Sequence, residues 1–155
     1  MHSRIFEISE SSFIDKDDHY FFDFEDLESM PSGIDYIVET ENREDDIEWL
    51  RDVMSHYKGI IFDDESFIVS TDFKNEYFEK RFKDLKERVE ELTLEEFSDE
   101  NKGMMELYYI RKAIEDRLGF RVFSYDYGNL SFDTFVRYMK PNVRYYIGGI
   151  GDYHY

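Results

Sequence analysis

The sequence predicts a single α+β domain spanning residues 1–155, in which an antiparallel or mixed sheet of about five to seven short strands is packed by three to four helices. The length suits one domain, because a chain of 155 residues can bury about 68–70% of its unfolded surface in one core. Aromatic residues make up 19% of the chain and occur along its whole length, which is typical of a folded protein. Short segments of alternating polarity are interleaved with longer segments of helical period, so both strands and helices are expected.

Three strands are predicted near the N-terminus. Residues 4–8 alternate between polar and apolar side chains and predict the opening strand. Residues 20–25 predict a half-exposed strand, with aromatic side chains on one face and Asp23 and Glu25 among those on the other. After a turn, residues 35–39 predict a third short strand.

The first predicted helix runs from about residue 43 to 57. Asn42 is its predicted N-cap, acidic residues occupy the first turn, where they interact favourably with the helix dipole, and Gly59 follows its end. Residues 60–62 and 67–69 then read as two strands, which a short polar turn joins into a hairpin.

Two further helices are predicted in the middle of the chain. Residues 73–92 carry apolar side chains at helical spacing, and acidic residues precede basic ones by four positions, which is the favourable orientation for such pairs. The next helix carries an apolar stripe from Leu107 to Leu118, and Gly119 is its predicted C-terminal stop.

The C-terminal part predicts a strand, a short helix and a last strand. Residues 120–125 form the predicted strand, and the helix is expected to run from a Ser131 cap through Met139. Residues 143–147 predict the last strand, so the glycine-rich residues 148–155 are expected to form a terminal turn or tail.

Charge is the most informative property of the composition. The chain has 37 acidic and 19 basic residues, a formal net charge of −18, and residues 1–65 hold 20 of the acidic residues but only 5 basic ones. Direct binding of DNA, RNA or anionic lipid is not expected, because each requires a basic surface that displaces counterions from phosphates. The composition favours a basic protein surface as the partner.

The candidate partner-binding residues are acids of this N-terminal part. Clustered charge of one sign repels itself, whereas interspersed charge would provide solubility at a lower electrostatic cost, so solubility alone does not account for the cluster. Alternate acids on a strand lie about 6.6 Å apart and can present a regular row of negative charge to a groove built for a phosphate backbone. The candidates are Asp15, Asp17, Asp18, Asp23, Glu25, Asp26 and Glu28, then Glu44, Asp45, Asp46 and Glu48, and the turn residues Asp63, Asp64 and Glu65.

No catalytic residue, metal site or cofactor is predicted. The sequence contains no cysteine, which excludes a disulfide framework, a thiolate zinc site and a cysteine nucleophile. Residues 15–26 place acids at intervals, but Tyr20 and Asp26 stand where a calcium loop of the EF-hand type has glycine and glutamate. The glycines of residues 148–151 lack the Lys-Ser/Thr of a phosphate-binding loop.

Two tyrosine doublets, Tyr108-Tyr109 and Tyr145-Tyr146, are also candidate contact residues. Adjacent side chains cannot both point inward from a strand and rarely do so from a helix. One tyrosine of each doublet is therefore expected at the surface, where it could anchor a partner.

These features predict a non-enzymatic inhibitor or adaptor that occupies a basic, nucleic-acid-binding surface of another protein. In composition and charge layout, though in no motif, the chain resembles the small acidic DNA-mimic proteins of phages and mobile elements, such as antirestriction and anti-CRISPR proteins. The resemblance implies inhibition of a nuclease or another DNA- or RNA-binding protein. A toxin-immunity protein that neutralises a basic nuclease fits the same charge, and a small enzyme with an unrecognised site or a homo-oligomeric protein also remains open.

The sequence predicts a cytoplasmic protein that does not enter membranes. The absence of cysteine suits a reducing compartment. The first residues lead directly into an amphipathic stretch without the apolar core of a signal peptide, and no apolar run approaches the roughly 18 residues that a membrane span requires.

Overall fold

The computed structural model describes residues 2–12, 33–116, 119–124 and 126–155 of the chain. This part forms the predicted α+β fold, with a mixed sheet of seven strands and five helices. The helices are α1 (Arg43–Ser55), α2 (Thr71–Glu91), α3 (Leu94–Ser98), α4 (Lys102–Ile114) and α5 (Phe132–Tyr138). None of the helices in the described residues is long and apolar enough to cross a membrane.

The sheet is built around its longest strand, β7. The strand order is β3-β4-β7-β1-β5-β6, and β2 pairs with β7 as well. Among the strand pairings of the described residues, only that of β1 with β5 is parallel. The strands are β1 (His2–Ser9), β2 (Tyr36–Glu39), β3 (Ile60–Asp63), β4 (Ser66–Val69), β5 (Arg121–Ser124), β6 (Gly128–Ser131) and β7 (Arg144–His154).

Most of the predicted elements are confirmed within one to three residues at their ends. The exceptions are α3 and β6, which were not predicted, the helix through Leu107, which begins at Lys102 and ends at Ile114 rather than continuing to Leu118, and the last strand, which ends at His154 rather than at Ile147. The strand predicted for residues 20–25 lies outside the described residues.

The prediction of a glycine-rich tail is wrong, because residues 148–154 continue β7 in the middle of the sheet. The pairing of β1 with β7 shifts register between Phe6 and Ile8, where two residues of β7 lie opposite one of β1. At this bulge the Gly149 N–H donates to Glu7 Oε2 at 2.7 Å, and Glu7 is fully buried. The carboxylate of Glu7 therefore accepts a backbone N–H at the irregular point of the ladder.

The main core lies between one face of the sheet and three helices. It includes Phe6 and Phe67 from the sheet, Leu50 and Met54 from α1, and Phe73 from the start of α2, all fully buried. Residues of α5 complete this core. A smaller cluster of Ile5, Ile37 and Tyr153 is separate from the main core. Ile5 and Phe6 are adjacent in β1, so their side chains point to opposite faces of the strand.

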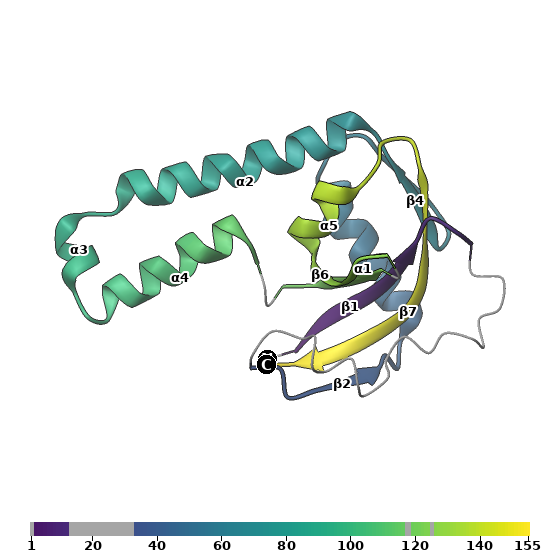
Figure 1. Cartoon of the computed structure of the whole chain (residues 1–155), viewed down its shortest axis with the longest axis horizontal. Coiled ribbons are helices and arrows are strands. Elements are labelled where there is room, and N and C mark those ends of the chain that lie inside the picture. The colour runs from purple at the N-terminus through teal and green to yellow at the C-terminus, as the bar shows by residue number, and fades with distance from the viewer. Residues whose placement is uncertain (1, 13–32, 117–118, 125) are drawn as a thin grey trace.

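Two helices project from this body, which comprises the sheet with α1 and α5. In Figure 1, α2 and α4 run side by side away from the sheet, and α3 lies at the far end. We call the part of α2 from Phe78 onward, with α3 and α4, the arm. The first two turns of α2 belong to the core, since Phe73 and Tyr77 are buried in it.

A buried carboxylate joins the arm to the body. Asp133 of α5 is 2% exposed and lies 2.8 Å from Arg81 Nε of α2. It also accepts hydrogen bonds from the Tyr77 hydroxyl and, at 2.8 Å, from the backbone N–H of Asp116 just beyond α4. Burial, together with the charge of Asp133, raises the pKa of the Tyr77 hydroxyl far above its ordinary value. One side chain thus holds both helices of the arm at their base.

Candidate functional site

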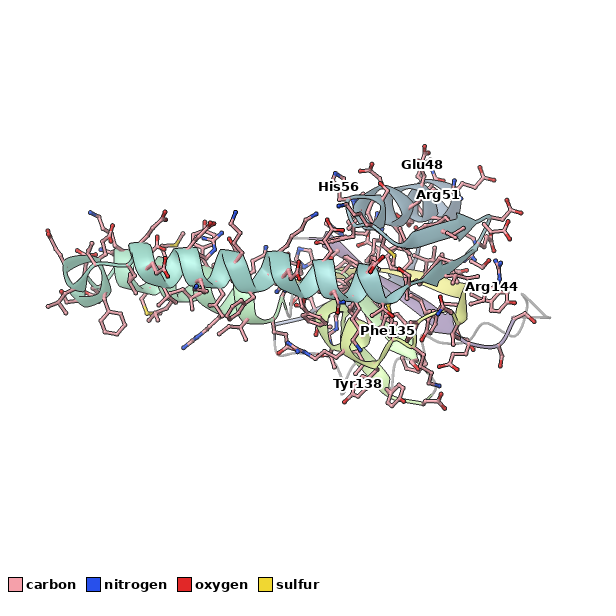
Figure 2. All side chains as sticks on the ribbon, turned by 90° about the horizontal axis from the view of Figure 1, so that it is seen from above. Glu48, Arg51, His56, Phe135, Tyr138 and Arg144 are labelled. Carbon is pink, nitrogen blue, oxygen red and sulfur yellow. The ribbon has the colours of Figure 1, made fainter. Side chains whose placement is uncertain are left out.

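The described part of the acidic N-terminal region presents a row of carboxylates along the outer face of α1. Its members Glu44, Asp45, Glu48 and Asp52 are all exposed, and we call them the α1 stripe. Successive residues of a helix turn by about 100°, so these four positions fall within one side of the helix. Figure 2 shows Glu48 projecting outward from α1.

Local sequence accounts for the orientation of α1. The Asn42 side chain accepts a hydrogen bond from the Asp45 N–H at 3.4 Å and caps the helix, as predicted. Ile47, Leu50 and Met54 recur at helical spacing and are buried against the sheet. Burial of this apolar side leaves the α1 stripe facing solvent.

Arg51 is a basic residue of α1 that lies beside the α1 stripe. Its Nη2 donates to the backbone oxygen of Asp64 at 3.1 Å, and its guanidinium lies 5.6 Å from the centre of the Phe62 ring. These contacts direct Arg51 toward the β3–β4 hairpin. Neither Glu44 nor Glu48 forms an ion pair with any residue that the structure describes.

Asp46, by contrast, is a structural residue. It is 7% exposed, accepts a hydrogen bond from Arg4 Nε at 2.7 Å and is also bonded by the Thr40 hydroxyl. Arg4 contacts Asp152 as well, with 2.9 Å between Nη1 and Oδ1. The carboxylate of Asp46 therefore ties α1 to β1.

The acids of the β3–β4 turn also contact arginines of the same chain. Glu65 forms a bidentate pair with Arg43, at 2.9 and 3.1 Å, and Arg43 in turn donates to the carbonyl oxygens of the β7 bulge. Asp63 Oδ2 lies 3.0 Å from Arg144 Nη1. Asp64 is exposed and has a φ of 46°, as a turn residue.

The structure therefore separates the seven described candidates. Glu44, Asp45 and Glu48 are brought together on α1 with Asp52, and Asp64 is the exposed acid of the nearby turn, whereas Asp46, Asp63 and Glu65 each contact an arginine. Sequence reasoning missed Asp52, although its spacing of four residues from Glu48 indicates the same helix side. The other candidates, Asp15, Asp17, Asp18, Asp23, Glu25, Asp26 and Glu28, lie outside the described residues.

The tyrosine doublets behave differently from each other. Tyr145 is buried in the core while Tyr146 is half-buried, as a strand requires. On α4, both Tyr108 and Tyr109 are exposed, at 47% and 38%. The expectation of one surface tyrosine per doublet is too low for α4, because this helix packs along one side only.

A small pocket opens where β1, β5 and α5 meet. Its lining includes Glu10, Asp126, Tyr127 and Tyr138, and the two tyrosine rings stack at 4.6 Å. The charge of Glu10 is neutralised by Lys140, whose Nζ lies 2.8 Å from Glu10 Oε1. Among the residues described around this pocket there is no histidine.

Within residues 2–12, 33–116, 119–124 and 126–155, no group of three or more His, Asp or Glu side chains is arranged to hold a metal ion. Comparison with known proteins gives no further assignment: no protein-family model, no curated protein and no solved structure matches this chain.

Proposed function

We propose that this chain is a non-enzymatic binding protein that uses the α1 stripe to occupy a basic, nucleic-acid-binding surface of another protein. The observation that carries the proposal is the row of solvent-facing carboxylates on α1, within a chain of net charge −18. A basic groove that normally holds a phosphate backbone is the kind of surface that such a row complements.

The linear charge density of the α1 stripe supports this choice of partner. From Glu44 to Asp52 the helix advances about 12 Å, at 1.5 Å per residue, and this length carries four carboxylates. That is roughly one negative charge per 4 Å, compared with about one per 3.4 Å along one strand of DNA. The acids Asp46, Asp63 and Glu65 do not contribute, because they are neutralised within the chain.

Helix energetics also support a role in binding. Glu44 and Glu48, and likewise Glu48 and Asp52, are like charges four residues apart, an arrangement that costs a helix about 0.2–0.5 kcal/mol per pair. The helix dipole favours acids in the first turn, which explains Glu44 and Asp45 but not Asp52. The last two acids of the stripe therefore oppose the stability of α1.

The test is a comparison of two charge-reversed variants with equal net charge. One carries Glu44→Lys, Glu48→Lys and Asp52→Lys, and the control carries the same change at the exposed acids Glu90, Glu91 and Glu100 of the arm. We expect the immobilised wild type and the immobilised control to capture basic proteins at low salt. High salt, or added DNA or RNA, should release the captured proteins. The stripe variant should capture none of them, with thermal unfolding no lower than that of wild type.

Two outcomes would contradict the proposal. Equal loss of capture in both variants would mean that only overall acidity matters. Undiminished capture by the stripe variant would place binding elsewhere on the molecule. If the released proteins are nucleases, an activity assay with each variant separates inhibition of the active site from binding elsewhere on the enzyme.

A further inference from the structure

One edge of the arm exposes large apolar side chains. Phe82 and Val89 of α2 are 64% and 53% exposed, and Met104 and Ile114 of α4 are 67% and 54% exposed. We call these four residues the apolar edge. Scaling side chains of about 150–250 Å² by these fractions gives roughly 360–600 Å² of exposed surface, which is the size of the largest apolar patch on a typical monomer, and such patches are often functional.

The four residues lie on the same side of the two-helix arm. Arg88 of α2 lies over the ring of Tyr109 of α4 at 5.4 Å. This contact marks the side of the junction between the two helices that is opposite to the apolar edge. At about 100° per residue, Phe82 and Val89 point away from the side marked by Arg88. Figure 1 shows that α4 runs antiparallel to α2. At about 100° per residue, Met104 and Ile114 lie on the side of α4 away from Tyr109, and in an antiparallel pair this is the same side as that of Phe82 and Val89.

The apolar residues of α2 follow the spacing of a coiled-coil seam. Phe78, Phe82, Leu85 and Val89 of α2, with Leu92 at its C-cap, alternate in steps of four and three residues. Leu85 and Leu92 are half-buried within the chain, whereas Phe82 and Val89 are exposed. The fold of one chain therefore covers only part of the seam, and a further helix pair is needed to cover the rest.

The charges beside the seam indicate which kind of partner covers the exposed residues. Residues 78–92 contain five acidic and five basic side chains, so this part of α2 is neutral in a chain of net charge −18 and offers little attraction to a basic protein. Glu79 and Lys86 are exposed beside the seam, and neither forms an ion pair within the described part of the chain. A two-fold axis near Phe82 brings Glu79 of one α2 opposite Lys86 of the other, and the reverse pair forms at the same time.

We propose that the apolar edge is covered by the apolar edge of a second copy of this chain, with the two arms antiparallel about a two-fold axis. The four helices then form a bundle that buries Phe82 and Val89. An antiparallel arrangement also keeps the two acidic bodies at opposite ends of arms about 20 Å long, more than twice the screening length of about 8 Å at physiological salt. This inference does not depend on the proposed function.

The first test measures the mass of the full chain in solution over a range of concentrations. Sedimentation equilibrium should show twice the chain mass of 18.9 kDa at high concentration. Phe82→Glu should weaken the dimer by at least about tenfold, because it places a charge in the centre of the interface. Ile61→Glu, at a side chain of β3 that is 67% exposed, is the matched control and should leave the dimer intact.

The second test uses the charge pair and distinguishes the antiparallel arrangement from others. Glu79→Lys and Lys86→Glu should each weaken the dimer several-fold, and the double variant should recover it, because the reciprocal pairs form again with exchanged signs. Circular dichroism and the unfolding midpoint establish that each variant is folded. A wild type that stays monomeric at every concentration, a dimer insensitive to Phe82→Glu, or a double variant that does not recover would overturn the proposal.

Discussion

The body and the arm use the same kind of amphipathic helix in opposite ways. In the body, α1 buries Ile47, Leu50 and Met54 and leaves acids on its outer side. In the arm, α2 and α4 pack on each other beyond the sheet, so large apolar side chains such as Phe82 and Met104 stay exposed. A helix on a sheet can bury its whole apolar stripe, whereas a helix with one helical neighbour buries only part of it.

The two regions also differ in charge. The outer side of α1 carries acids with few compensating bases, whereas residues 78–92 of the arm are neutral. This difference underlies the two proposals, a basic partner for the body and an apolar, charge-balanced partner for the arm. The molecule offers two surfaces with different chemistry, and each can be disrupted separately.

The largest expected difference between body and arm comes from the same substitution at two leucines. Leu50 of α1 is fully buried, and Leu94 of α3 is 82% exposed. Leu50→Ala should lower the free energy of unfolding by about 3–4 kcal/mol, because it leaves a cavity in the core. Leu94→Ala should lower it by less than about 0.5 kcal/mol. Denaturant unfolding at low protein concentration measures both, and similar losses would contradict the division between body and arm.

A somewhat smaller effect is expected where the arm meets the body. Asp133→Ala should cost about 3 kcal/mol, because it leaves Arg81 and the Tyr77 hydroxyl without their buried acceptor. The control is Asp84→Ala, which removes a half-exposed pair with Arg88 on α2 and should cost no more than about 0.5 kcal/mol. Hydrogen exchange should also show faster opening of the helix ends at the arm base in the Asp133 variant. Unchanged exchange there would mean that Asp133 does not hold the arm.

The smallest effect is a dependence of body stability on alkaline pH. Burial raises the pKa of Tyr153 to about 12, from about 10 in the unfolded chain. The unfolded state therefore loses this proton first, and the free energy of unfolding should fall as the pH rises from 10 to 12. Tyr153→Phe should make that fall shallower but not abolish it, because burial also raises the pKa of Tyr77.

At neutral pH the same variant should lose about 1 kcal/mol, since the Tyr153 hydroxyl donates to the Gly119 carbonyl oxygen. Tyr108→Phe, at an exposed position of the arm, is the control and should leave the pH dependence of the free energy of unfolding unchanged. Identical alkaline curves for Tyr153→Phe and wild type would show that Tyr153 does not contribute.

Local sequence signals were sufficient for most of the described elements and failed where pairing partners are distant. The Asn42 cap and the apolar spacing of α1 and α2 are local, and both helices are confirmed. The glycines after Ile147 resembled a tail because glycine has a low strand propensity. They form strand β7 because β1 and β2, both far away in the chain, pair with them.

The candidate site was predictable only in part for the same reason. Periodicity identifies Glu44, Glu48 and Asp52 as neighbours on one side of a helix. It cannot show that Asp46, in the same acidic run, turns inward to Arg4, 42 residues away, or that Asp63 meets Arg144, 81 residues away. Composition likewise did not distinguish acids that face solvent from acids that stabilise the fold.

The sequence by itself determined the helices α1, α2 and α5, the hairpin and the excess of negative charge, because capping, periodicity and composition act through neighbours in the chain. Only the tertiary structure decided which carboxylates remain free for a partner and which apolar residues remain uncovered. Both depend on which distant segments the fold brings into contact, and therefore on burial and long-range ion pairs. The same packing that neutralises Asp46 and Asp63 leaves the α1 stripe in solvent and the apolar edge of the arm exposed.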